Sequence, residues 1–168
     1  YGNVMGSRGS VLPLFLQMKN QSNYFPITDK RMTRFNVTLE EGVDIVLWSI
    51  KNSYGSEIVV PKLKSFNIID LASAIDSNKK IKLIGMRPGE KLHEELITYS
   101  DGYNTIDIGK YYLILPDNNK LIKNYYSKLT NKKNIKFHTG FTYNSKDNKD
   151  FLSVSELKKL IITESNKE

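Results

Sequence analysis

Cysteine is absent from the 168 residues of this chain. Its absence excludes disulfide bonds, thiolate nucleophiles and cysteine-ligated metals. No apolar run approaches the roughly 20 residues that a membrane-spanning helix needs. The opening Tyr1-Gly2-Asn3-Val4 lacks the charged and apolar regions of a signal peptide. From these absences we expect a cytoplasmic location.

Motifs that bind nucleotide cofactors or metals are also missing. There is no Gly-x-Gly-x-x-Gly and no Walker lysine loop, so the chain has no dinucleotide or triphosphate cradle of its own. No tyrosine is followed by a lysine four positions later, which excludes a Tyr-x-x-x-Lys catalytic pair. His93 and His138 have no ligand spacing around them, and we therefore predict no metal site.

The net charge of +7 is concentrated towards the end of the chain. Residues 117–168 hold 11 lysines and 6 acidic residues, which leaves little net charge on residues 1–116. The hydrophobic content of 39% is enough for a core. We predict one main portion over residues 1–116 and a basic, partly helical extension over 117–168. We interpret this extension as a solvated surface and expect no nucleic-acid partner. The alternative is that the extension makes the chain a polyanion-binding module.

Helical and strand patterns alternate along the chain, which indicates α/β architecture without a complete doubly wound sheet. Helices are predicted at 13–19, at 39–50 behind a Thr38/Glu41 capping box, at 68–75, around 92–97, at 121–129 and after a Ser153/Glu156 capping box. Strands are predicted at 24–28, 57–60, 81–84 and 111–115. The buried stripe of the second helix is expected to be Leu39, Val43, Val46, Leu47 and Ile50.

The segment Gly6-Ser7-Arg8-Gly9-Ser10 follows what we interpret as a strand end and leads into the first predicted helix. Such a turn places free backbone amides, the positive end of a helix dipole and a guanidinium together, a combination that favours an anionic ligand. The alternative is a plain loop in which Ser10 only caps the helix.

Two arginines stand in turns before predicted helices. Arg34 precedes the Thr38 capping box and is suited to a bidentate contact with phosphate, or alternatively to a surface ion pair. In Arg87-Pro88-Gly89-Glu90, a rigid turn could direct Arg87 towards a phosphate and Glu90 towards paired hydroxyls. The alternative there is a connecting turn in which Glu90 complements a helix dipole.

Taken in order, four segments resemble a known family: 1–11 (YGNVMGSRGSV), 26–29 (PITD), 32–35 (MTRF) and 85–94 (GMRPGEKLHE). The family is that of the bacterial UDP-N-acetylglucosamine 4,6-dehydratases of polysaccharide biosynthesis, which are extended short-chain dehydrogenase/reductases. The similarity runs from residue 1 to about 116 and recurs faintly at 151–157. It implies the carboxyl-terminal, substrate-binding part of such an enzyme, that is, an incomplete Rossmann-type fold plus a small α/β lobe.

The resemblance implies contacts for individual residues. Those expected to bind the UDP-sugar are Asn3, Arg8, Gly9, Ser10, Val11, Leu12, Tyr24, Pro26, Arg34, Arg87 and Glu90. Arg34 and Arg87 would hold the diphosphate from two sides, Glu90 would accept from the ribose hydroxyls, and the backbone around Tyr24 and Pro26 would contact the uracil. Val4 would lie beside the nicotinamide of NADP.

The family's amino-terminal half, with its NADP loop and its catalytic tyrosine and acid, has no counterpart in these residues. The expected partners are therefore a UDP-sugar, the missing half and further copies of the parent enzyme, with NADP bound mainly by the missing half. No catalytic residue is assigned here, and the chain alone is expected to be inactive. A nucleotide-sugar epimerase or reductase of the same fold is the alternative, because the missing half would decide the reaction.

Overall fold

The computed structural model describes residues 2–116, 120–132, 135, 137 and 140–165. It divides into two compact units, each assembled from separated segments of the chain. Unit 1 comprises residues 39–62 and the described residues of 95–144, and unit 2 comprises 2–38, 63–94 and the described residues from 145 onward. The predicted boundary at residue 116 is instead a single cut along the chain. It concerns a division of function, and it stays a prediction.

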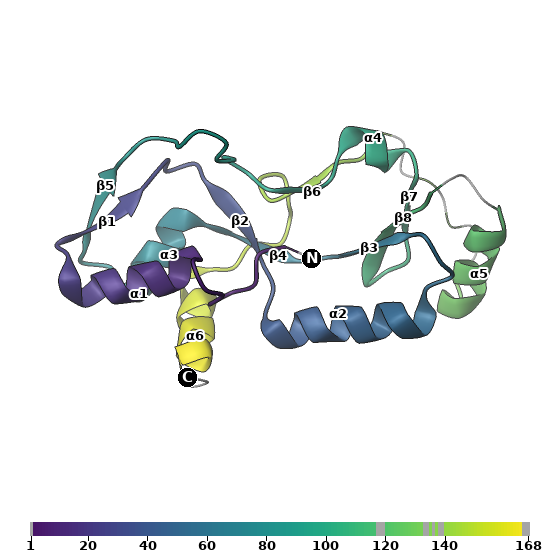
Figure 1. Cartoon of the computed structure of the whole chain (residues 1–168), viewed down its shortest axis with the longest axis horizontal. Helices are drawn as coiled ribbons and strands as arrows, with labels where there is room; N and C mark the ends of the chain where they lie inside the picture. The colour runs from purple at the N-terminus through teal and green to yellow at the C-terminus, as the bar shows by residue number, and fades with distance from the viewer. Residues whose placement is uncertain (1, 117–119, 133–134, 136, 138–139, 166–168) are drawn as a thin grey trace. The chain divides into compact units, whose positions relative to one another are not determined.

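Unit 2 is a mixed α/β structure (Figure 1). Its elements are α1 (Val11–Gln21), β1 (Tyr24–Ile27), β2 (Thr33–Asn36), β4 (Lys64–Asn67), α3 (Ile68–Ile75), β5 (Lys80–Leu83) and α6 (Val154–Ser165). β1 pairs with β5 in parallel and β2 pairs with β4 in antiparallel orientation. An isolated parallel bridge joins Val4 to Val37, so the start of the chain runs beside the end of β2.

The core of unit 2 lies where α1, α3 and α6 pack together. Phe15 of α1 stacks on Phe25 of β1 with ring centroids 4.8 Å apart, and Leu71 and Leu157 are fully buried. Lys79 closes the end of α1, since its ammonium donates to the carbonyls of Met18 and Ser22 at 2.8 Å each. A cation suits this end because the carbonyls of the last helical turn have no intrahelical partner. α1 is thereby held in place, and its opposite end faces the site described below.

Unit 1 is also mixed α/β. Its elements are α2 (Leu39–Asn52), β3 (Ile58–Pro61), β6 (Glu95–Ile97), α4 (Tyr99–Gly102), β7 (Thr105–Asp107), β8 (Tyr111–Ile114), α5 (Lys120–Thr130) and β9 (Tyr143–Asn144). The strands form an antiparallel sheet in the order β3-β8-β7 and a separate β6-β9 pair. Gly102 permits a close crossing of the chain, because a Cβ at this position would lie 2.1 Å from the Phe141 carbonyl oxygen.

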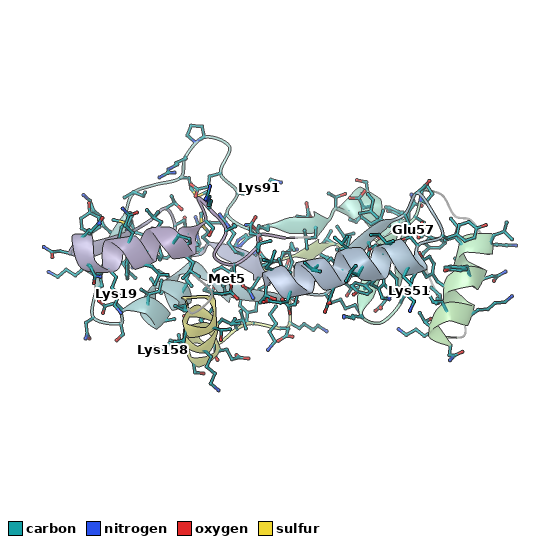
Figure 2. All side chains as sticks on the ribbon, turned by 60° about the horizontal axis from the view of Figure 1, so that its bottom comes forward. Met5, Lys19, Lys51, Glu57, Lys91 and Lys158 are labelled. Carbon is teal, nitrogen blue, oxygen red and sulfur yellow. The ribbon has the colours of Figure 1, made fainter. Side chains whose placement is uncertain are left out.

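The predicted face of α2 is wrong. Gly42 and Ile45 are its buried residues, and Trp48 beside them stacks against Tyr111 at 4.5 Å between ring centroids. The expected buried stripe is instead exposed, with fractions of 63% for Leu39, 59% for Leu47 and 78% for Ile50. Figure 2 shows α2 with its side chains as sticks. α2 therefore packs within unit 1 through Gly42, Ile45 and Trp48 and leaves its more apolar face open.

One predicted helix is also wrong. The segment 92–97 was expected to be helical, but residues 95–97 form strand β6, and 92–93 form a bend before it. The i, i+4 spacing of Leu92 and Leu96 misled the prediction, and of the three residues of β6 only Ile97 is fully buried. Among the described helices, none is long and apolar enough to cross a membrane.

Candidate functional site

A cavity of about 410 Å³ lies within unit 2, where the start of the chain, the beginning of α1 and strand β2 meet. The predicted ligand-binding residues that line it are Asn3, Val4, Arg8, Gly9, Ser10, Val11, Leu12, Arg34 and Glu90. Met5, Ser7, Phe35, Asn36 and Phe66 complete the lining. The fold therefore brings together residues that lie up to about 90 positions apart in the sequence.

One wall of the cavity is the turn that enters α1. Gly6 and Gly9 both have φ of +77°, a left-handed conformation that side chains with a Cβ rarely adopt. The Ser7 N–H donates to the Val4 carbonyl at 3.2 Å and the Ser10 N–H donates to the Ser7 carbonyl at 3.0 Å. The first N–H groups of α1 have no intrahelical acceptor, so this wall offers backbone donors and the positive end of a dipole.

Two polar side chains at the cavity carry buried atoms without a hydrogen-bond partner in the described part of the chain. Ser10 occupies the amino-cap position of α1, yet its side chain makes no capping bond and its Oγ is unpaired. Asn36, at the end of β2, is 7% exposed and its Oδ1 is unpaired. Leaving such groups unpaired costs free energy, which favours partners supplied from outside the chain.

Arg34 is a buried cation of the cavity wall, with a side chain only 16% exposed. Its Nη1 donates to the carbonyls of Thr33 at 2.7 Å and Leu92 at 3.2 Å. Its Nη2 donates to the Met32 sulfur at 3.0 Å, and a thioether is a weak acceptor. The guanidinium is thus anchored by backbone on one side and retains donors that an anionic ligand would satisfy better.

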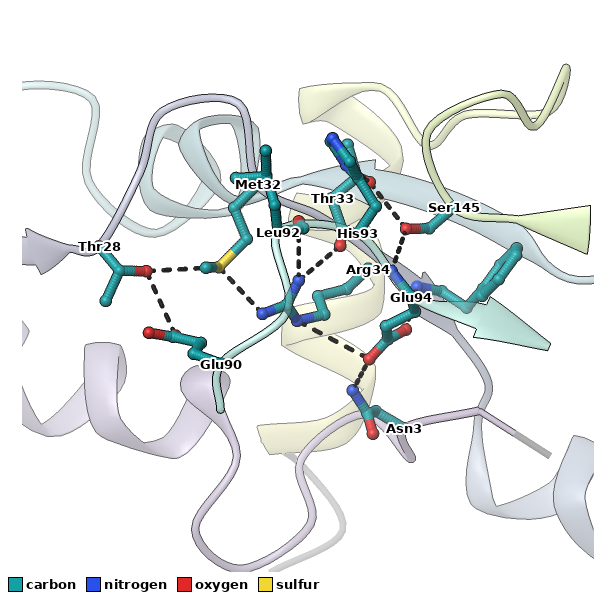
Figure 3. A network of polar contacts seen from close by, with 11 residues as sticks. Asn3, Thr28, Met32, Thr33, Arg34, Glu90, Leu92, His93, Glu94 and Ser145 are labelled. Atoms are coloured by element: carbon teal, nitrogen blue, oxygen red, sulfur yellow. Dashed lines mark hydrogen bonds and ion pairs between the residues drawn. The ribbon is translucent and has the colours of Figure 1, made fainter. Parts of the chain in front are cut away.

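Glu94 balances the charge of Arg34, and sequence reasoning did not select it (Figure 3). Its Oε1 lies 3.7 Å from Arg34 Nε and accepts a hydrogen bond from Asn3 Nδ2, while its Oε2 accepts from the Phe35 N–H at 2.7 Å. Burial raises the pKa of the Glu94 carboxyl, against the lowering effect of the Phe35 N–H and the Arg34 charge. Glu94 ends the family-like segment 85–94, but the sequence does not show which of the acids after Arg87 lies beside Arg34.

Glu90 lines the cavity from the turn that precedes Glu94. Its Oε1 accepts from Thr28 Oγ1 at 3.3 Å, and its Oε2 accepts from the Arg87 N–H at 3.1 Å. The Glu90 N–H in turn donates to the Arg87 carbonyl at 3.0 Å. The carboxylate is therefore fixed by its own turn and also lines the cavity. The alternative role for Glu90, complementing a helix dipole, is wrong, because strand β6 and no helix follows this turn.

Three predicted residues are not brought to the cavity. Arg87 is exposed and does not line the cavity. Tyr24 and Pro26 lie on β1, where they pair in register with Lys80 and Lys82 of β5. Lys82 also lies over the Tyr24 ring, 5.0 Å from its centroid. Their expected roles at a diphosphate and a uracil stay predictions.

Comparison with known families extends these observations. A family model described as "Polysaccharide biosynthesis protein" matches residues 1–116. Among curated proteins, the chain is 42% identical over 164 residues to the UDP-N-acetylglucosamine 4,6-dehydratase (inverting) of Campylobacter jejuni subsp. jejuni serotype O:2, covering 96% of this chain and 49% of that protein. It is 37% identical over 167 residues to the UDP-glucose 4-epimerase of Rickettsia akari, covering 97% of this chain and 48% of that protein.

Among solved structures, the X-ray structure of Pen from Bacillus thuringiensis matches with a TM-score of 0.78 and 30% sequence identity. The match covers 98% of this chain and 49% of Pen. The chain thus spans about half the length of the relatives it matches. The mixed α/β fold described above is the fold of that half.

Proposed function

We propose that this chain, which belongs to the polysaccharide biosynthesis protein family, is the nucleotide-sugar-binding part of a UDP-N-acetylglucosamine 4,6-dehydratase. Its relatives are nucleotide-sugar dehydratases and epimerases. The dehydratase of Campylobacter jejuni has the higher identity of the two relatives described above. The substrate class proposed for this chain is a UDP-sugar.

The observation that carries this proposal is the composition of the cavity. Its wall combines the amino end of α1, the anchored guanidinium of Arg34 and the carboxylate of Glu90. A UDP-sugar has matching groups: a doubly charged diphosphate for the cation and the backbone amides, and hydroxyls for the carboxylate. The unpaired atoms of Ser10 and Asn36 add hydrogen-bonding capacity at the same place.

A second half of the enzyme is part of the proposal. The relatives are about twice as long as this chain, and α2 presents Leu39, Val43, Val46, Leu47 and Ile50 to solvent on one face. A contiguous apolar helix face of this kind typically marks a surface that another element covers. We propose that the cofactor-binding half packs on this face, with self-association of the parent enzyme through other surfaces.

NADP is the cofactor that the resemblance implies. The chain has no glycine-rich phosphate loop, so its own contribution to such a site is small. Val4 lines the cavity beside Asn3, which suits an apolar contact with a nicotinamide ring. NADP would supply redox chemistry at the sugar when bound, while the residues of this chain hold and orient the UDP-sugar.

Epimerisation is the second candidate, because Rickettsia relatives described as UDP-glucose 4-epimerases match nearly the whole chain. Both reactions begin with the same substrate class, and the cavity described here would serve either. The product formed by the full-length parent enzyme from UDP-N-acetylglucosamine distinguishes them. A 4-keto-6-deoxy sugar indicates dehydration, and a sugar inverted only at C4 indicates epimerisation.

Calorimetry on the 168-residue chain tests the proposal. We expect UDP and UDP-N-acetylglucosamine to bind, and uridine, which lacks the diphosphate, to bind at least about ten-fold more weakly because it forms no charged hydrogen bonds. The same chain with added NADP should form no product. Equal affinities for UDP and uridine would contradict the proposed diphosphate site, and turnover by the chain alone would contradict the proposed division of labour.

A further inference from the structure

We propose that Glu94 is a positioning residue of the cavity, which orients Asn3 and Arg34 for the ligand. This inference rests on the proposed function and deepens it, because it identifies what holds the ligand-facing groups before the ligand arrives. Glu94 was not among the residues expected from the sequence, and it does not itself line the cavity. Its effect must therefore pass through the side chains that it contacts.

The first step is the convergence of three segments on one carboxylate, which Figure 3 shows. Asn3 comes from the start of the chain, Arg34 and Phe35 come from β2, and Glu94 precedes β6. Oε1 of Glu94 accepts from Asn3 Nδ2 and lies 3.7 Å from Arg34 Nε, and Oε2 accepts from the Phe35 N–H at 2.7 Å. Both carboxylate oxygens are engaged, so the side chain has one preferred orientation.

The second step concerns Asn3. An asparagine amide can rotate to present either its oxygen or its nitrogen, and an acceptor on one side fixes the choice. Because Glu94 takes the Nδ2 donor, the Asn3 oxygen lies on the opposite side of the amide, as Figure 3 shows. Asn3 thereby presents an acceptor to the cavity that it lines. A sugar hydroxyl or acetamido N–H is the matching group.

The third step concerns Arg34. Glu94 lies on the Nε side of the guanidinium, and the Thr33 and Leu92 carbonyls hold Nη1. Nη2 is left with the Met32 sulfur as its acceptor. A phosphate oxygen is a far stronger acceptor than a thioether, so Nη2 is the donor that a diphosphate would take. Glu94 thus fixes which edge of the guanidinium remains available.

The carboxylate can act in this way because its backbone is itself fixed. The Glu94 N–H donates to Ser145 Oγ at 2.9 Å, and the Glu94 carbonyl accepts from the Ser145 N–H at 2.8 Å. Ser145 is fully buried, and its Oγ also contacts Thr33 Oγ1 at 2.7 Å. A rigid outer group of this kind is what keeps ligand-contacting side chains in a productive geometry.

A double-mutant cycle in UDP-N-acetylglucosamine affinity tests the inference. The variants are Glu94→Gln, Asn3→Ala and the two together, with Glu95→Gln as a matched control on the adjacent, exposed residue. We expect Glu94→Gln and Asn3→Ala each to weaken binding by about ten-fold, and the double variant to be scarcely weaker than Glu94→Gln, since Asn3 is no longer oriented in that background. Glu95→Gln should bind as the unmodified chain does.

Outcomes that overturn the inference are distinct from those that overturn the proposed function. If the unmodified chain binds the UDP-sugar and Glu94→Gln binds it equally, or if the two losses simply multiply, Glu94 is not a positioning residue. If the unmodified chain binds neither UDP nor the UDP-sugar, the proposed function fails and this inference with it. Should Glu94→Gln not fold by circular dichroism, the cycle is run with Glu94→Asp, which keeps the charge but shortens the reach to Asn3.

Discussion

Arg34 lines the cavity with a side chain that is only 16% exposed, so its charge must be satisfied by its immediate neighbours. Arg34→Ala would leave the Thr33 and Leu92 carbonyls without this donor and would remove the cation that pairs with the Glu94 carboxylate. We expect the free energy of unfolding to fall by about 1–3 kcal/mol and UDP to bind about ten-fold more weakly. Arg34→Lys should recover only part of both losses, because an ammonium lacks the planar fork.

Arg87 provides a control, within the same chain, for the stability part of this prediction. It is exposed and lies outside the cavity, so Arg87→Ala should change the free energy of unfolding by less than about 0.5 kcal/mol. Urea denaturation and calorimetry with UDP measure both effects. An Arg34→Ala variant as stable as Arg87→Ala, with unchanged UDP affinity, would show that the described contacts of Arg34 contribute neither to the free energy of unfolding nor to UDP binding.

The residues of the cavity were predictable to different degrees. A glycine turn before a helix has a recognisable sequence pattern, and residues 8–12, which were expected to face one ligand, line one cavity. Glu94 and Ser145 were not predictable, because each matters through a partner that is distant in sequence: Ser145 lies 51 positions from Glu94 and 112 from Thr33. No local pattern records a contact of that separation.

At the scale of elements, α2 has two faces whose burial predicts opposite mutational effects. Ile45 is 6% exposed and Leu47 is 59% exposed, although they are two positions apart. Ile45→Ala should lower the free energy of unfolding by about 2–4 kcal/mol, since it leaves a cavity in a packed region. Leu47→Ala should change it by less than about 0.5 kcal/mol in this chain.

Chemical denaturation of the two variants, monitored by circular dichroism, makes this comparison. Leu47→Ala has the same class of change as Ile45→Ala, which makes it the matched control. Equal destabilisation by both would mean that the apolar face of α2 is covered, for example by a second copy of the chain, and the oligomeric state by light scattering would then identify that copy.

The capping box of α6 is an element whose stability depends on pH. Glu156 Oε2 accepts from the Ser153 N–H at 2.9 Å and from Ser153 Oγ at 2.7 Å, and Lys64 lies 2.9 Å from Oε1. Bonds from the Ser153 N–H and hydroxyl, followed by Lys64, lower the pKa of Glu156 to about 2. A lowered folded-state pKa contributes stability above the unfolded value, and this contribution is lost as the pH falls towards 2.

Glu156→Gln should therefore lower the melting temperature by a few degrees at pH 7, and the difference from the unmodified chain should shrink between about pH 5 and pH 2. Thermal unfolding followed by circular dichroism across that range is the measurement. Glu164→Gln, in the last turns of the same helix, is the control for loss of a negative charge. A difference that stays constant with pH would assign the effect of Glu156→Gln to something other than the cap.

The elements also show where sequence patterns suffice. α3 was predicted at its observed bounds, with Leu71 and Ile75 buried as expected, because a full amphipathic turn pattern is present. The Ser153/Glu156 capping box was likewise confirmed. β2 and β4 were missed, since each contains a single apolar residue, Phe35 or Phe66, among its four positions. The α2 stripe failed for another reason: the pattern reveals an apolar face but not what covers it.

At the scale of the whole molecule, unit 2 combines the start of the chain, its middle and its end. The cavity depends on this arrangement, because Asn3, Arg34 and Glu94 come from different segments and meet through one network. Family membership and the half-length match to nucleotide-sugar enzymes favour the same ligand class that the anion-suited wall fits. The central claim is that this particular cavity binds the UDP-sugar.

The most direct test of that claim is a titration of the ¹⁵N-labelled chain with UDP-N-acetylglucosamine, followed by amide chemical shifts. The account predicts the largest shifts at Ser7–Leu12, Arg34–Asn36 and Glu90, the backbone of the cavity wall. It predicts that the amides of α5, which carries Lys120, Lys123 and Lys128, stay unchanged. Shifts concentrated on the lysine-rich α5, with the cavity wall unaffected, would contradict the account and favour non-specific binding of polyanions.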